Sequence, residues 1–181
     1  MDADGAVCAD DLIESLRTDG IAVRDRYLSA SHLEALNGSA AARRDRGDSI
    51  CWLDEPLFAP ERQLLALFEN LRRNLNQSLF LGLCDLEQHY ARYPAGAGYA
   101  RHVDQPRGRG ARRLSSIVYL NERWRESDGG VLRCATDGGD FREIEPVGCR
   151  LVLFLTEGRE HEVLPASRER LSITGWFLGR Q

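Results

Sequence analysis

The chain has 181 residues, of which 43% are hydrophobic and 29% are charged, and its formal net charge is −4. This length suits one domain with a hydrophobic core, and the composition is ordinary for a globular protein. The negative net charge argues against a general nucleic-acid binder, and no apolar run approaches the length of a membrane span. We therefore expect neither a nucleic-acid partner nor a membrane partner.

The cysteines and the first residues bear on the compartment. The five cysteines are scattered, and no two have C-x-x-C spacing. This pattern argues against a disulfide framework or a zinc site. The acidic first residues lack a basic flank and an apolar stretch, so no secretory signal is predicted. Together these features predict a cytoplasmic protein. All 24 basic residues are arginine, so any cationic anchor for a carboxylate must be arginine.

Three helices and a short strand are predicted in the first half of the chain. The first helix is Asp10–Asp19, where apolar residues recur at helical spacing, and the strand Ile21–Val23 follows. Ser29 or Ser31 can cap a second helix. Pro60 opens a third helix, which has a broad apolar face.

Short apolar runs separated by turns containing Gly or Pro dominate the second half. The runs are Leu86–Tyr93, Leu114–Leu120, Gly130–Cys134, Phe141–Ile144, Arg150–Leu155 and Arg170–Leu178. Helices followed by many short strands predict a mainly β fold, an antiparallel sandwich or barrel buttressed by the N-terminal helices. No repeat or linker divides the chain. We interpret residues 1–181 as a single domain, with helical support at about 8–80 and a β core at about 85–179.

His102, Asp104 and His161 are candidate metal ligands. Two imidazoles and one carboxylate form the facial triad that holds non-haem Fe(II) and leaves coordination positions open. Residues 102 and 104 point to the same side if the segment is a strand. An H-x-D pair is common by chance, and a histidine in the place of His161 is also compatible with a structural role. The three residues together predict an iron site.

Arg170 is a candidate carboxylate anchor. Alternation along the last strand puts Arg170, Ser172, Thr174 and Trp176 on one face, which suits a pocket lining. Leu171, Ile173 and Phe177 share the other face, which should pack against the helices. A buried arginine needs a partner, and a dicarboxylate ligand would supply one. The alternative is a salt bridge to Glu143, Glu145 or Glu169.

An ordered set of motifs over most of the chain carries a family resemblance. The motifs are Arg46-Gly47-Asp48 with Trp52, Tyr93-Pro94, Gly98-Tyr99, Arg101-His102-Val103-Asp104, Val118-Tyr119-Leu120-Asn121, Gly129-Gly130-Val131-Leu132-Arg133, Ile144-Glu145-Pro146, His161-Glu162-Val163 and Arg170 to Trp176. From about Gly20 to Trp176 the sequence resembles the prolyl 4-hydroxylase branch of the 2-oxoglutarate/Fe(II) oxygenases. It is most similar to the animal prolyl hydroxylases that act on hypoxia-inducible factor and to their bacterial relatives.

The resemblance implies a double-stranded β-helix, or jelly-roll, core. It implies Fe(2+) held by His102, Asp104 and His161, and 2-oxoglutarate whose far carboxylate is held by Arg170 and Tyr119. The residues that it places around the cosubstrate are Tyr93, Leu132, Val163 and Thr174. It also implies O2 as a cosubstrate and ascorbate as a candidate cofactor.

The resemblance places Asp48, Trp52, Tyr99, Arg112 and Trp176 at the substrate entrance. The basic cluster Arg107, Arg109, Arg112 and Arg113 is either a solvated loop or a surface that recognises an acidic protein segment. The stretch 38–45 is shorter than the hairpin that covers the peptide in the animal enzymes. His89, within a predicted strand, is interpreted as structural.

Three functional hypotheses follow. The first is a 2-oxoglutarate- and Fe(II)-dependent dioxygenase that hydroxylates a prolyl residue of a protein or peptide, with succinate and CO2 as co-products. The second keeps the cofactors but replaces the substrate with a free amino acid or small metabolite. The third is a non-catalytic binding or sensor module. A module of that kind should have a damaged ligand set, whereas all three ligands and the arginine are present.

Overall fold

The computed structural model describes residues 10–43, 50–105 and 110–180. Its α-helices are α1 (Asp10–Asp19), α2 (Ala30–Ala42) and α3 (Ala59–Leu79), and a short 3-10 helix spans Glu126–Asp128. All three α-helices lie in the first half of the chain, as the apolar spacing predicts. None of the helices in the described part is long and apolar enough to cross a membrane.

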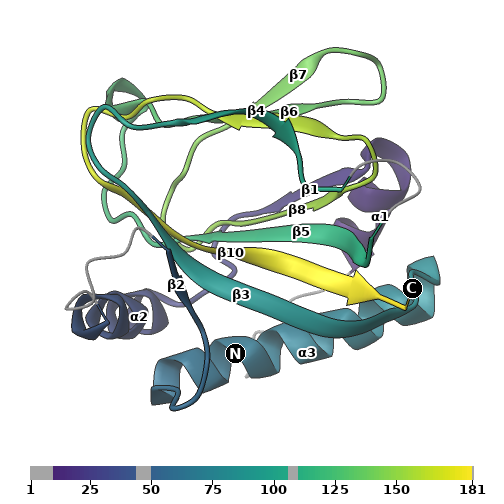
Figure 1. Cartoon of the computed structure of the whole chain (residues 1–181), viewed down its shortest axis with the longest axis horizontal. Helices are drawn as coiled ribbons and strands as arrows, with labels where there is room; N and C mark the ends of the chain where they lie inside the picture. The colour runs from purple at the N-terminus through teal and green to yellow at the C-terminus, as the bar shows by residue number, and fades with distance from the viewer. Residues whose placement is uncertain (1–9, 44–49, 106–109, 181) are drawn as a thin grey trace, which may run out of the picture.

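The described residues form ten strands, arranged in two antiparallel sheets that face each other (Figure 1). The major sheet has the order β1 (Ile21–Arg24), β8 (Leu151–Leu155), β5 (Arg112–Tyr119), β10 (Arg170–Gly179), β3 (Leu83–Tyr93) and β2 (Ile50–Trp52). The minor sheet has the order β4 (Tyr99–Val103), β9 (Glu160–Val163), β6 (Leu132–Ala135) and β7 (Phe141–Ile144). The mainly β, helix-buttressed architecture predicted from the sequence is confirmed.

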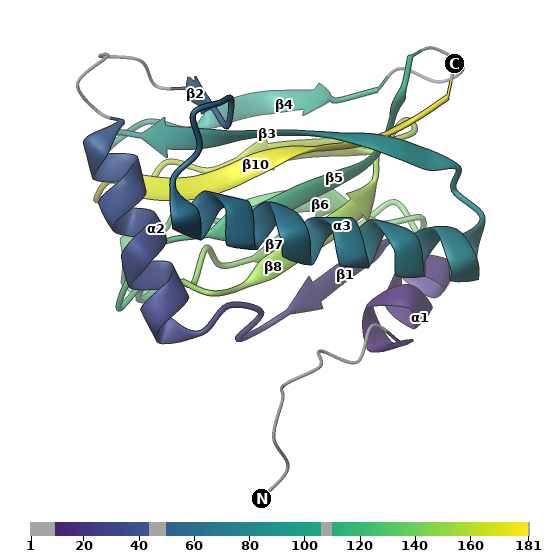
Figure 2. The ribbon, with the colours of Figure 1, turned by 90° about the horizontal axis from the view of Figure 1, so that it is seen from below.

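The helices cover the outer face of the major sheet, where the larger hydrophobic core lies. Figure 2 shows α3 running across β3 and β10. Ile173 and Phe177 of β10 belong to this core and are fully buried. The Phe177 ring lies 5.8 Å from that of Phe68 in α3. One face of β10 therefore packs on the helices, as its alternation predicts, and the other is left for the space between the sheets.

Cross-strand register puts particular residues on the inner face of each sheet. In the major sheet, Thr174 of β10 lies opposite His89 of β3 and Ile117 of β5, and His89 also lies opposite Trp52 of β2. Directly opposed residues of antiparallel strands share a face. In the minor sheet, His102 lies opposite His161. The two sheets thus direct these side chains toward each other.

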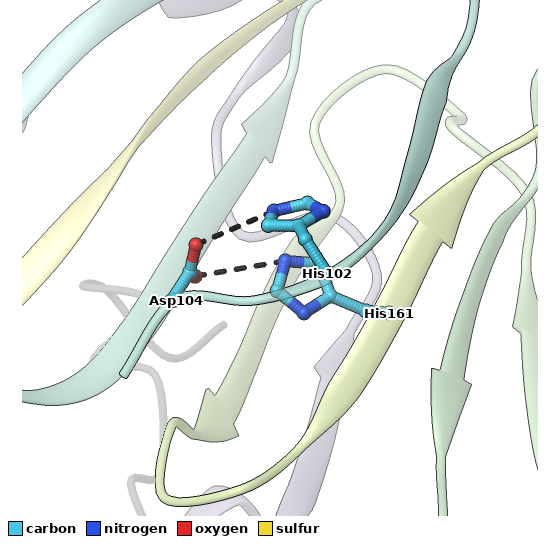
Figure 3. Close-up of side chains that lie close together, drawn as sticks. All are labelled: His102, Asp104 and His161. Atoms are coloured by element: carbon cyan, nitrogen blue, oxygen red, sulfur yellow. Dashed lines mark ion pairs between the residues drawn. The ribbon is translucent and has the colours of Figure 1, made fainter. Parts of the chain in front are cut away.

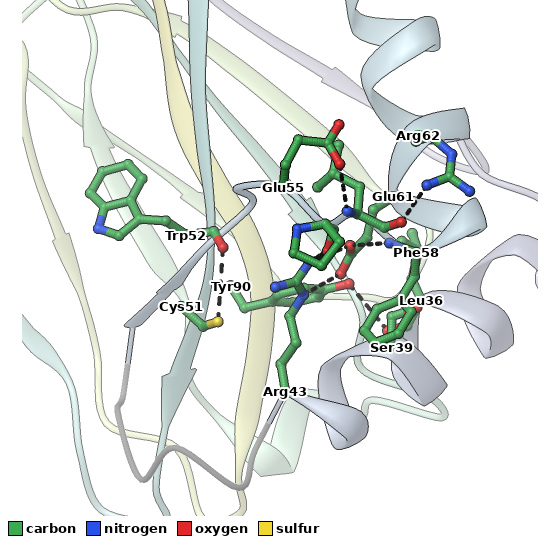
Figure 4. Close-up of polar contacts among 12 residues, drawn as sticks. Leu36, Ser39, Arg43, Cys51, Trp52, Glu55, Phe58, Glu61, Arg62 and Tyr90 are labelled. Carbon is green, nitrogen blue, oxygen red and sulfur yellow. Dashed lines mark hydrogen bonds and ion pairs between the residues drawn. The ribbon is translucent and has the colours of Figure 1, made fainter.

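A buried ion pair joins α2 to α3 (Figure 4). Arg43, at the end of α2, donates to both carboxylate oxygens of Glu61 at 2.7 Å, and the Glu61 side chain is fully buried. Glu61 also accepts a 2.8 Å hydrogen bond from the backbone N–H of Phe58, which caps α3. Arg43 donates to the carbonyl of Pro56 as well. These contacts hold the end of α2 against the start of α3, and β2 lies between the two in the chain.

Candidate active site

His102, Asp104 and His161 converge between the two sheets (Figure 3). Nε2 of His102 lies 3.5 Å from Oδ1 of Asp104, and Nε2 of His161 lies 3.6 Å from Oδ2. One ligand atom from each residue lies within 4.8 Å of the other two. β4 ends at Val103, so Asp104 reaches the site from the bend after the strand. This differs from the simple strand alternation expected for His102 and Asp104.

Backbone contacts fix the tautomer of both histidines. Nδ1 of His102 lies 2.8 Å from the carbonyl oxygen of Ala100, and Nδ1 of His161 lies 3.3 Å from that of Arg159. A carbonyl oxygen can only accept, so each Nδ1 carries the proton and donates it. The Nε2 lone pairs are then free to bind a metal, in the arrangement that is usual for metal-ligating histidines.

The carboxylate ligand is held in its ionised form. Burial alone would raise the pKa of Asp104, but its contacts with the two histidines and Ser115 hold that pKa below its usual range. The Ser115 hydroxyl donates a 2.6 Å hydrogen bond to Oδ2. Two imidazoles that present Nε2 beside an ionised carboxylate are the donor set expected for Fe(II). The residues present therefore fit the metal.

Arg170 is almost completely buried, with a relative exposure of 2%. Its Nε donates to the carbonyl of Gly130 at 3.1 Å, and its Nη2 lies 3.4 Å from the Tyr119 hydroxyl. Within the described ranges, no carboxylate forms an ion pair with Arg170. Two of the suggested partners are engaged elsewhere: Glu169 with Arg92 and Glu143 with Arg133.

An arginine that is buried without a carboxylate is costly to fold, so an anionic ligand would relieve the cost. Tyr93 and Tyr119 flank the guanidinium, with ring centroids 5.3 and 4.9 Å from its central carbon. Burial raises the pKa of both tyrosines, so they stay neutral hydroxyls. Neutral hydroxyls beside a guanidinium suit a carboxylate guest.

One cavity of about 710 Å³ contains most of the sequence-predicted site residues. Those that line it are His102, Asp104, His161, Arg170, Tyr93, Leu132, Val163, Thr174, Trp52, Tyr99, Arg112 and Trp176. Tyr119 is fully buried beside Arg170 rather than on the cavity wall. Asp48, Arg107 and Arg109 lie outside the described residues.

The cavity wall also contains His89, which the sequence interpretation treated as structural. His89 lines the cavity between Trp52 and Trp176, with ring centroids 4.8 and 5.7 Å away. The Arg112 guanidinium lies 3.4 Å above the Trp176 ring. The four flat groups form what we call the aromatic wall: Trp52, His89, Trp176 and Arg112. The only sequence signal for His89 was its position in an alternating strand two residues from Ala91 and four from Tyr93.

Two facing antiparallel sheets that enclose a His-Asp-His set and a buried arginine define the class of 2-oxoglutarate-dependent oxygenases. The model of the 2OG-Fe(II) oxygenase superfamily matches residues 88–178. The chain belongs to this superfamily.

Within this superfamily, the chain is similar to several prolyl hydroxylases. The chain is 37% identical to human Egl nine homolog 1 over an alignment of 148 residues, and the match covers 77% of this chain but only 34% of that protein. It thus spans about a third of that relative's length. A crystal structure of a Pseudomonas putida prolyl-4-hydroxylase is 40% identical, with a TM-score of 0.88, and the match covers 96% of this chain and all of that one. A prolyl hydroxylase from Trichoplax adhaerens, in complex with a peptide of the hypoxia-inducible factor oxygen degradation domain, is 27% identical. Its TM-score is 0.82, and the match covers 94% of this chain and 88% of that one.

Proposed function

We propose that this protein is a 2-oxoglutarate- and Fe(II)-dependent dioxygenase that hydroxylates a prolyl residue of a protein or peptide. Succinate and CO2 are the co-products. The observation that carries the proposal is that the candidate metal ligands and a candidate carboxylate anchor lie in one cavity. The metal ligand set of His102, Asp104 and His161 shares it with Arg170, a buried cation that pairs with no carboxylate of the described residues.

The residues of the chain bind and orient the metal and the cosubstrate. When bound, Fe(2+) and 2-oxoglutarate supply the activation of O2 and the hydroxylation of a C–H bond. Arg170 fixes the far carboxylate of the cosubstrate, and the neutral hydroxyls of Tyr93 and Tyr119 suit donation to the same group. Leu132, Val163 and Thr174 line the same cavity and limit the space that the cosubstrate can occupy.

The mouth of the cavity supports a peptide substrate. Trp52 and Tyr99 line it and are 43% and 53% exposed, so apolar surface continues from the metal site to the outside. A large exposed aromatic surface beside a cavity is typical of a binding site for an extended partner. Arg112 adds a positive charge at the same wall, which favours acidic residues near the target proline.

The matched relatives support the same substrate class, because two of them are prolyl hydroxylases and one was solved with a peptide. The four cysteines in the described part are all free, which supports a reducing cytoplasm as the compartment. We treat residues 1–181 as one oxygenase domain, since the helices and both sheets contribute to a single site and its support.

The test is turnover of a synthetic library of proline-containing peptides by protein reconstituted with Fe(2+), 2-oxoglutarate and ascorbate. Mass spectrometry should detect one added oxygen on proline in a subset of peptides, with an equal amount of succinate. Free proline and other free amino acids are assayed in parallel. Asp104→Ala and His161→Ala should abolish both products and keep the circular dichroism of the wild type. Turnover of free amino acids alone would replace the peptide proposal, and succinate formation by either variant would overturn the metal assignment.

A further inference from the structure

His89 occupies the centre of the aromatic wall. It lies opposite Trp52 on one side and Thr174 on the other, so three strands fix its position on the inner face. The side chain is only 5% exposed, yet it lines the cavity beside the metal ligands. Figure 4 shows Trp52 pointing away from α3, on the opposite side of β2 from Cys51. The ring of His89 is therefore part of the cavity wall rather than of the helix-covered core.

The two nitrogens of this ring have no hydrogen-bond partner among the described residues. Nδ1 is fully buried and unpartnered. Nε2 is not fully buried, so it is the ring nitrogen that a molecule in the cavity can reach. A buried N–H without a partner is rarer than a buried acceptor without one. The proton of the neutral ring therefore belongs on Nε2, which makes the accessible nitrogen a donor.

The surroundings keep the ring neutral. Burial, together with the charge of Arg112, lowers the pKa of His89 to about 4. The neighbouring indoles restrict the ring to one orientation, so little side-chain entropy is lost when it binds. A rigid, neutral donor held between two indole rings is the kind of precisely placed polar group that gives a pocket its specificity.

We propose that His89 is a substrate-recognition residue, whose Nε2–H donates a hydrogen bond to a peptide carbonyl oxygen next to the target proline. The inference rests on the proposed function, because it assumes a prolyl peptide in the cavity. A prolyl residue has no backbone N–H, so the polar backbone atoms beside its ring are the carbonyl oxygens of the residue before it and of proline itself. A donor in the wall suits these acceptors.

The experiment compares His89→Phe with His89→Gln, using a peptide that the wild-type enzyme hydroxylates in the library screen. Phenylalanine keeps a flat ring between the indoles but has no nitrogen. Glutamine restores an N–H at nearly the position of Nε2. We expect His89→Phe to raise the KM for the peptide roughly threefold to tenfold, the range of one neutral hydrogen bond. His89→Gln should recover most of this loss. The KM for 2-oxoglutarate should stay unchanged, because both variants keep Arg170, the proposed anchor of its carboxylate.

A change in the peptide gives a matched test that needs no variant to fold. Two versions of the same peptide carry a thioamide, a weaker acceptor, either before proline or after it. Wild-type turnover of one version should fall by roughly the same factor, whereas His89→Phe should turn over that thioamide and the normal amide equally well. His32→Phe, a change far from the cavity, serves as the control for a lost imidazole and should retain the wild-type KM.

The outcomes separate the two proposals. If the wild type hydroxylates prolyl peptides but His89→Phe has an unchanged KM, or if neither thioamide affects the wild type, the inference about His89 is overturned and the proposed function stands. If the wild type hydroxylates no prolyl peptide in the library, the proposed function fails and the inference fails with it. A raised KM for 2-oxoglutarate in His89→Phe would assign the residue to the cosubstrate instead.

Discussion

The hydroxyl of Ser115 donates a 2.6 Å hydrogen bond to Oδ2 of Asp104, from the strand next to β10. This contact orients the carboxylate that would bind the metal. Outer contacts of this kind typically change metal affinity by about 10- to 100-fold. We predict that Ser115→Ala weakens Mn(II) binding by about tenfold, measured by electron paramagnetic resonance titration.

The neighbouring Ser116 provides the control. It points to the other face, where it accepts a hydrogen bond from Gln88. Ser116→Ala should reduce the stability of the fold and leave Mn(II) affinity unchanged. Equal Mn(II) affinity in the wild type and Ser115→Ala would show that Asp104 is positioned without this hydroxyl.

Arg170→Lys should preserve the fold and impair cosubstrate binding. Lysine keeps the charge but cannot present two parallel N–H groups to a carboxylate. We predict an increase in the KM for 2-oxoglutarate of about 10- to 100-fold, and a larger increase for Arg170→Ala, from succinate formation at varied cosubstrate concentration. Arg17→Lys, at the exposed pair with Glu14 and outside the cavity, should have the wild-type KM. An unchanged KM in Arg170→Ala would exclude Arg170 from the cosubstrate site.

The buried state of His89 predicts a specific dependence of stability on pH. Its pKa falls from 6.5 to about 4 on folding. Between these values the unfolded chain binds a proton that the folded chain does not, so the free energy of unfolding decreases as the pH falls through this window. The full loss is at most roughly 3 kcal/mol.

The measurement is urea denaturation of the metal-free protein at about pH 7 and about pH 4.5. The wild type should lose roughly 2 kcal/mol more than His89→Phe between the two conditions. Comparing the change with pH in each protein removes the contribution of the carboxylates, which both proteins share. The same loss in the two proteins would show that His89 accepts a proton in the folded state.

The ion pair of Arg43 and Glu61 should matter for stability mainly because neither charge can be left buried without the other. Removing one partner leaves a buried charge, so Glu61→Gln should lower the free energy of unfolding by about 3–5 kcal/mol in urea denaturation. Replacing both residues, Arg43→Met with Glu61→Leu, should recover most of that loss. The exposed pair of Arg17 and Glu14 is the control, and its disruption should cost less than about 0.5 kcal/mol. A cost below about 1 kcal/mol for Glu61→Gln would contradict the buried-charge argument.

Local sequence patterns were sufficient for the elements with clear periodicity. The helices α1 and α3 follow from their apolar spacing, and β7 was predicted with its observed bounds. The short strands β2, β4 and β9 were absent from the predicted apolar runs. They are three to five residues long and rich in polar or exposed residues, so their conformation depends on pairing with other strands.

The ligand residues and Arg170 carry recognisable chemistry in a recognisable order, and the sequence identified them as candidates. The role of His89 depends on register. Nothing in the sequence shows that β2 pairs with β3 so that Trp52 lies opposite His89. The same limit applies to the salt-bridge alternatives for Arg170, because nothing in the sequence shows that Glu169 pairs with Arg92. Contacts between distant segments decide both cases.

The inner face of β10 carries Arg170 at one end and Trp176 at the other, and its neighbours hold it on both edges. A strand rises about 3.3 Å per residue, so the strand acts as a ruler of roughly 20 Å between the carboxylate anchor and the aromatic wall. A substitution in β10 changes one side chain and leaves the positions of the others unchanged. An insertion or deletion of one residue between positions 170 and 176 would turn every later side chain to the opposite face. Length variation in this family should therefore be tolerated in the loops around β10 and not within it.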